Sequence, residues 1–158
     1  MIFFFFKPLE IKERVFKETP IFEFKNFTIY ELDTKGLTTK MLGSSAAKYE
    51  DRYVVKDINY TDNSPKYRAN LVADNGVFKD KEHTIYLNNN VTYTSLNKNR
   101  FIFQTQKATY NTKTSIVVSD TNYTISLDYG YIQGTYIKYN ALLNRVFSKN
   151  VQAKYTIQ

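Results

Sequence analysis

The segment TIYLNNNVTYT, residues 84–94, alternates apolar and polar side chains along its whole length. Ile85, Leu87 and Val91 fall on one face, while Asn89 interrupts that face and threonines and asparagines form the other. Because successive side chains of a strand leave opposite faces, the pattern predicts a half-buried strand with one apolar face. The chain has no long segment with helical periodicity to cover that face, so a second sheet or a ligand must cover it.

Similar segments make up nearly all of the chain from residue 21 onwards. They are rich in Tyr, Phe, Val, Ile and Thr, and clusters of Asp, Asn, Gly and Pro separate them. The predicted strands are residues 22–32, 37–42, 53–60, 67–73, 84–94, 100–105, 115–120, 123–129, 131–138 and 145–157. The predicted turns are residues 33–36, 62–65, 74–76, 97–99 and 139–140. Many short strands without a long helix predict an all-β sandwich, barrel or solenoid.

A degenerate repeat of about thirty residues runs through these strands. Its landmark aromatics Tyr49, Phe78, Tyr110 and Tyr139 are separated by 29, 32 and 29 residues. Each is followed by a polar turn residue and then by β-rich sequence. The spacing predicts stacked units of two short strands, each too small to bury its own apolar face.

Composition narrows the range of possible functions. The 158 residues suffice for one domain with a sizeable core, and the absence of Cys excludes a disulfide scaffold, thiol catalysis and Cys-ligated metal. A net charge of +7 favours an anionic partner such as nucleic acid, a membrane surface or a phosphorylated ligand, or simply a well-solvated surface. Because the aromatic residues alternate into the apolar face, we interpret them as core and expect no nucleic-acid partner.

No catalytic arrangement stands out in the sequence. His83 lies in the charged turn KDKEHT, and the chain has no Gly-rich phosphate loop and no metalloprotease or EF-hand motif. Five acids lie near predicted strand ends, where turn chemistry explains them equally well: Asp57, Asp62, Asp74, Asp80 and Asp120. We therefore predict no catalytic residue, no metal and no cofactor, and an enzyme only if Asp57 and Asp120 share a cleft.

Two N-x-T triplets, DINYT at Asn59 and DTNYT at Asn122, carry an acid two residues upstream, as the extended bacterial N-glycosylation acceptor requires. Coincidence through the repeat explains them as well, so glycosylation at either residue stays open.

The first residues, MIFFFFKPLEIKER, carry five consecutive apolar side chains at residues 2–6 and then become charged. Such a run is too short to span a membrane, which takes about 20 apolar residues, or to be a signal-peptide core. We predict that residues 1–20 are the end of a mostly missing membrane anchor and its tether, and that residues 21–158 form the folded domain. A stub from a misplaced start is the alternative.

An ordered set of short motifs now points to a family. A strand ending in A-x-x-G-x-F is followed by I-x-L-x-x-x-V, T-x-x-A-x-Y, S-D and I-x-G. The residues are Ala73 to Phe78, Ile85 to Val91, Thr105 to Tyr110, Ser119 with Asp120, and Ile132 to Gly134. This order resembles the LptC family, the inner-membrane-anchored component of the lipopolysaccharide transport system. In the family a second Gly often follows the I-x-G motif, where this chain has Tyr136.

The resemblance implies a β-jellyroll of two facing antiparallel sheets, in the superfamily of LptA and the LptD N-terminal domain. It implies a non-enzymatic protein of the periplasm, tethered to the bacterial inner membrane, that takes lipopolysaccharide from the LptB–LptF–LptG transporter and passes it to LptA. An LptA-like soluble bridge protein is the first alternative. A basic nucleic-acid- or polysaccharide-binding β-domain is the second.

Two sets of candidate residues follow. The apolar groove for acyl chains is predicted from Leu37, Met41, Leu71, Ile85, Leu87, Val91, Tyr93, Phe101, Phe103, Ile125, Leu127, Val151 and Tyr155. The terminal strands leave open edges that invite strand addition. We expect the N-terminal edge to meet the transporter and the C-terminal edge to meet LptA, through Phe22, Phe24, Phe27, Ile29, Phe147, Val151, Ala153 and Ile157.

Overall fold

The computed structural model describes residues 20–34, 36–63, 68–96, 100–140, 142–143 and 145–156, without the side chains of Asp33 and Leu37. These residues form twelve strands and one 3₁₀ turn, Asp80–Glu82. The strands are β1 (Phe22–Asp33), β2 (Gly36–Lys48), β3 (Tyr53–Asp62), β4 (Ala69–Lys79), β5 (Thr84–Ser95), β6 (Phe101–Asn111), β7 (Ile116–Ser119), β8 (Tyr123–Leu127), β9 (Gly130–Gly134), β10 (Tyr136–Asn140), β11 (Arg145–Lys149) and β12 (Gln152–Tyr155).

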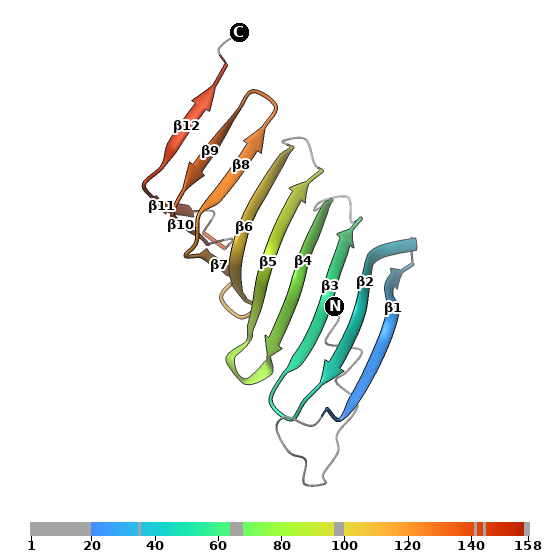
Figure 1. The fold of residues 1–158 in the computed structure, drawn as a ribbon. Coiled ribbons are helices and arrows are strands. Elements are labelled where there is room, and N and C mark those ends of the chain that lie inside the picture. Colours follow the sequence, from blue (N-terminus) through green and yellow to red (C-terminus); the bar gives the residue numbers. More distant parts are fainter. Residues whose placement is uncertain are drawn as a thin grey trace.

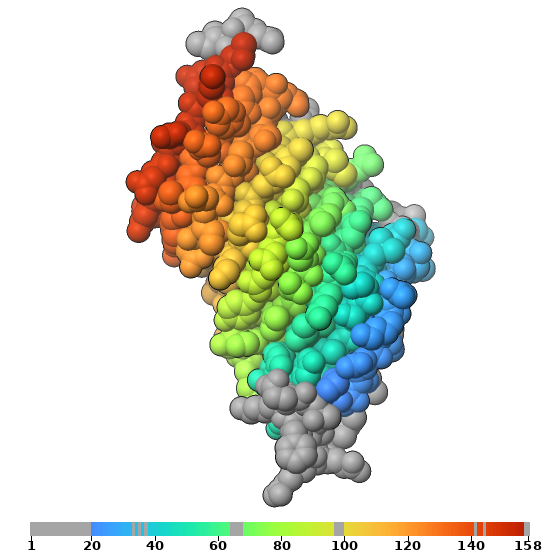
Figure 2. All heavy atoms as spheres, viewed as in Figure 1, coloured from blue at the N-terminus to red at the C-terminus, as the bar shows by residue number. Residues whose placement is uncertain are grey.

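All strand pairs are antiparallel, and β1 to β6 follow one another in chain order (Figure 1). Beyond β6 the sheet divides, because β6 pairs with β7 through one half of its length and with β8 through the other. One branch continues through β10 to β11, and the other continues through β9 to β12. The colours of Figure 2 therefore run in chain order from one end of the molecule to the other. The sheet is not closed, and the predicted all-β jellyroll is confirmed.

The long strands change direction near their middle, along a line that we call the crease. Asn26 in β1, Asp57 in β3 and Asn89 and Asn90 in β5 have φ angles of 48°, 54°, 66° and 53°. Asn and Asp tolerate this left-handed conformation better than other side chains, because their short polar groups bond locally. At the same level the later strands break, between β7 and β8, between β9 and β10, and at Asn150 between β11 and β12.

The crease switches the residues that face the interior. In β3, Tyr53 and Val55 are buried before Asp57, and Ile58 is buried after it, so the alternation shifts by one residue. Each long strand therefore contributes to both halves of the bent sheet. A single apolar cluster joins the halves: Met41, Ala46, Tyr53, Val55, Ile58, Ala73, Phe78, Leu87, Val91 and Ala108.

Most predicted strands are confirmed, but two predicted turns are wrong. Residues 139–140 belong to β10, where they pair with both β7 and β11. Residues 74–76 lie inside β4, where Asn75 pairs with Asn88 and Gly76 pairs with Leu87. The chain turns instead at residues 80–83, where His83 has a φ of 52°. Predicted strands 131–138 and 145–157 are each two strands, because the crease divides them.

The thirty-residue repeat has a simple structural origin. Phe78 pairs with Ile85, Ile85 with Tyr110, and Tyr110 with Val117, which in turn pairs with Tyr139. Three of the four landmark aromatics therefore occupy one row across the sheet. One repeat is a strand running out to this edge and a strand running back.

Candidate functional site

Two rows of apolar side chains cross the interior face of the sheet from one edge to the other. The first inner row, on one side of the crease, is Ile29, Met41, Tyr60, Leu71, Tyr93, Phe103, Ile125, Ile132 and Ala153. The second inner row, on the other side, is Phe22, Lys48, Tyr53, Phe78, Ile85, Tyr110, Val117, Tyr139 and Val146. Neighbours in a row are cross-strand partners, so each row is continuous.

Between the rows, the β2–β6 part of the interior is filled by protein side chains. Of the predicted groove residues there, Met41, Leu87 and Val91 are buried, with exposed fractions of 6%, 8% and 2%. Tyr53 and Phe78 pack with their ring centroids 5.9 Å apart. This part of the predicted groove is a packed core in the structure.

Away from these buried residues the interior lining is more accessible. Predicted groove residues that remain partly exposed are Leu71, Ile85, Phe101, Phe103, Ile125 and Leu127, and Tyr93 is 37% exposed. Burial, Asp62 and the phenol of Tyr139 together raise the pKa of Tyr93.

Lys48 is the charged member of the second inner row. Its ammonium lies 4.2 Å from the centroid of the Tyr53 ring. Burial lowers the pKa of Lys48, while Asp80 and Asp51 act in the opposite direction. The positive charge of Lys48 is therefore stabilised by the Tyr53 ring and by Asp80 and Asp51, at the N-terminal end of the row.

A polar group of side chains replaces the apolar core beyond β6. The hydroxyl of buried Thr105 lies 2.7 Å from that of Ser119 and 2.8 Å from that of Thr121. The Ser148 hydroxyl donates to the Tyr136 carbonyl oxygen and lies within hydrogen-bonding distance of the Tyr123 hydroxyl. The interior there combines these hydrogen bonds with buried Ile137 and with the Tyr123 ring, whose centroid lies 5.7 Å from that of Phe103.

The two ends of the sheet expose their edges differently. On the N-terminal edge, the predicted residues Phe22, Phe24, Phe27 and Ile29 pack against the apolar core. On the C-terminal edge, Phe147 and Val151 are 56% and 49% exposed, and Ala153 is also exposed. Tyr155, predicted for the groove, is 64% exposed, and the whole of β12 is accessible. The Leu37 side chain and Ile157 lie outside the described residues.

The remaining sequence candidates do not come together. Asp57 lies on the crease in β3 and Asp120 follows β7, four strands away, which is about 19 Å at the usual strand spacing. His83 is exposed in the 80–83 turn. Across the part of the chain that the structure describes, no group of three His, Asp or Glu side chains is arranged to hold a metal ion.

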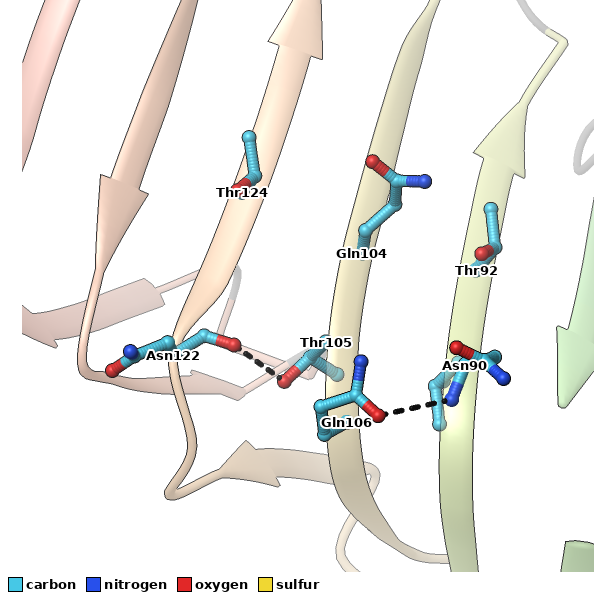
Figure 3. A pocket seen from close by; sticks show the side chains of 8 residues that line it. Asn90, Thr92, Gln104, Thr105, Gln106, Asn122 and Thr124 are labelled. Carbon is cyan, nitrogen blue, oxygen red and sulfur yellow. Dashed lines mark hydrogen bonds between the residues drawn. The ribbon is translucent and has the colours of Figure 1, made fainter. Parts of the chain in front are cut away.

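Sequence reasoning missed a polar hollow of about 300 Å³ on the opposite, outer face of the sheet (Figure 3). It is lined by Asn90, Val91, Thr92, Gln104, Thr105, Gln106, Asn122 and Thr124. The hollow forms where β5 bulges at the crease and β7 gives way to β8. The polar face of TIYLNNNVTYT was its only signal in the sequence.

Comparison with known proteins assigns the family. No helix in the described ranges is long and apolar enough to cross a membrane, and residues 1–19, with the predicted anchor, lie outside them. Comparison with curated proteins gives no match. The family model described as lipopolysaccharide-assembly, LptC-related, matches residues 3–156. The chain therefore belongs to the LptC-related family and takes part in lipopolysaccharide transport.

Proposed function

We propose that the protein holds the acyl chains of lipopolysaccharide between its two inner rows and passes the molecule from the LptB–LptF–LptG transporter to LptA. The observation that carries this proposal is the continuity of both rows from β1 to the β11 and β12 edges. Burying one CH₂ group is worth ~0.8 kcal/mol, so a chain of about twelve carbons gains on the order of 10 kcal/mol. Similar side chains on each successive strand allow that gain to be kept while the lipid moves.

The lipid is expected to bind first where the interior is accessible, between β5 and β10. There Tyr93, Phe103 and Ile125 of the first inner row are only partly covered. Around Met41, Tyr53, Phe78 and Leu87 the protein's own side chains occupy the same space. Passage along the full length of the rows therefore requires the two halves to separate in that part.

Photo-crosslinking in cells tests this proposal. A photoreactive residue at Phe103 should capture lipopolysaccharide, whereas one at Ile102 should not, because Ile102 neighbours it on the outer face. The same probe at buried Leu87 should capture less than Phe103. Equal capture at Phe103 and Ile102, or capture of oligonucleotide or glycan alone, would contradict an acyl-chain site.

For the hand-over we propose that LptA adds a strand at the exposed C-terminal edge. Ala153 lies in the accessible strand β12, opposite Ile132 of β9. Replacing Val151 or Ala153 by Pro removes a backbone N–H and disfavours further pairing. LptA binding should be abolished while the circular-dichroism spectrum is retained, and Ala153→Ser, which keeps the N–H, should bind normally. Normal LptA binding by both proline variants would contradict the assignment.

A further inference from the structure

The outer face carries an unassigned site in the polar hollow between β5, β6 and β8. Thr92 pairs with Gln104, and Gln104 pairs with Thr124, so a hydroxyl, an amide and a second hydroxyl form one row across three strands. Asn122 adds a second amide where the chain enters β8. Figure 3 shows these side chains around the same hollow.

These four side chains have no hydrogen-bond partner among the residues that the structure describes. The neighbouring polar groups are already occupied: Asn90 donates its side-chain amide to Asp74 at 2.8 Å, and the Gln106 side-chain oxygen accepts the Asn90 N–H at 3.4 Å. Farther along the same row, Gln133 donates to Gln152 at 2.9 Å. The side-chain amides of β9 and β12 therefore bond each other, whereas those of Gln104 and Asn122 have no such partner among the described residues.

The chemistry of the hollow selects for an uncharged ligand. Its lining contains amides, hydroxyls and one valine but no charged side chain, although the chain as a whole carries a net charge of +7. Amides and hydroxyls offer both donors and acceptors, as a polyol requires, whereas a phosphate or carboxylate ligand is normally held by cations. The β-branched side chains of Thr92 and Thr124 have few rotamers, so little freedom is lost when they bind.

We infer that this hollow binds a neutral saccharide. Its volume is at the lower end of the range for ligand sites, which suits a short stretch of sugar units. The inference does not depend on the acyl-chain proposal, because the hollow and the inner rows lie on opposite faces of the sheet. It adds a carbohydrate-recognition surface to a protein of lipopolysaccharide transport.

Titration of the isotopically labelled chain with maltohexaose, with chitohexaose and with an anionic oligogalacturonate tests the site. The neutral oligosaccharides should shift the amide resonances of Thr92, Gln104, Asn122 and Thr124, and the anionic one should not. No shift at about 10 mM, which allows for very weak binding, would overturn the inference. Equal binding of the anionic sugar, or shifts confined to the inner rows, would do the same.

Variants locate the binding groups. The triple variant Thr92→Val, Gln104→Val, Thr124→Val should weaken binding at least about tenfold, because it removes the two hydroxyls and the amide that form the polar row. The matched control Thr94→Val, Ser126→Val changes the same face of β5 and β8 outside the hollow and should bind as the parent does. If the triple variant loses its dispersed spectrum, Gln104→Ala alone must weaken binding. If the triple variant folds and binds as the parent does, the assignment is overturned. If Gln104→Ala has to replace it, parent-like affinity in that variant overturns the assignment.

Discussion

The interior is packed differently in the β2–β6 part and in the β7–β12 part of the sheet. All ten buried members of the apolar core come from β2–β6. In β7–β12, the buried side chains are Ser119, Tyr123 and Ile137, and two of these three carry hydroxyls. The first part has a continuous apolar core, and the second combines a smaller amount of apolar burial with interior hydrogen bonds.

The difference also appears in the strands themselves. The crease bends β1–β6 without interrupting them, but it divides the later chain into strands of four or five residues. A short strand buries less apolar surface than a long one. Local opening is easiest where few apolar contacts must be broken. The β7–β12 part is therefore the part expected to open for a lipid or a partner strand.

The largest expected contrast comes from truncating one phenylalanine in each part. Phe78 is 9% exposed and packs on Tyr53, so Phe78→Ala should lower the free energy of unfolding by about 3–5 kcal/mol. Phe147 is 56% exposed, and its ring lies in a T-shaped arrangement with that of Tyr136, with the centroids 6.1 Å apart. Phe147→Ala should cost less than about 1 kcal/mol. Urea unfolding measures both, and similar losses would contradict the contrast.

Alternation alone was enough to predict individual strands. The β5 prediction of residues 84–94 differs by one residue from Thr84–Ser95, because a half-buried strand must alternate to cover one face. Asn89, which interrupts the apolar face in the sequence, has a φ of 66° and lies on the crease. Strand identity is thus encoded locally.

The crease could not be predicted in the same way. Asp74 and Asn75 look like turn residues, and the same property that favours turns also allows a bend within a strand. Only the pairing of neighbouring strands distinguishes the two. Likewise, Leu87 and Phe103 occupy equivalent apolar positions in sequence, yet Leu87 is buried and Phe103 is partly exposed. That difference arises from how closely the two halves approach.

A second test removes hydrogen bonds that join β6 to the interior of the β7–β12 part. Thr105→Val keeps the shape of the side chain but removes the hydroxyl that contacts Ser119, Thr121 and the Asn122 carbonyl oxygen, while Ser119 keeps its longer 3.4 Å contacts with Thr121. Losing the hydrogen bonds of this buried hydroxyl should cost about 1–2 kcal/mol in urea unfolding. Thr109→Val on the same strand is the control and should be nearly neutral. A stabilised Thr105→Val would show that apolar burial governs both parts.

A third test loosens the C-terminal edge alone. A Cβ at Gly130 would collide with the Lys154 carbonyl oxygen and lie 2.5 Å from the Tyr155 Cα, both backbone atoms of β12. Gly130→Ala should therefore displace β12, at a local cost of about 1–2 kcal/mol. Hydrogen exchange should show faster exchange in β12 and unchanged protection in β3–β5, and Asp128→Ala in the adjoining turn should change neither. Loss of protection throughout the sheet would mean that the two parts unfold as one.

The smallest expected effect is a loss of stability in the β2–β6 part as the pH is raised. Burial first, and then Asp62 and Glu31, raise the pKa of Tyr60 in the first inner row from 10.0 to about 12. An unfolded tyrosine loses its proton at lower pH than the folded one, so the stabilisation is present below pH 10 and disappears as the pH rises from 10 to 12. Two pKa units would correspond to about 2.7 kcal/mol, but this half-buried phenol is partly screened by solvent, and about 1 kcal/mol is expected. Tyr60→Phe should flatten the decline in urea stability over that range, whereas an unchanged decline would assign the alkaline sensitivity to other groups, such as Tyr93 in β5, whose pKa is also raised.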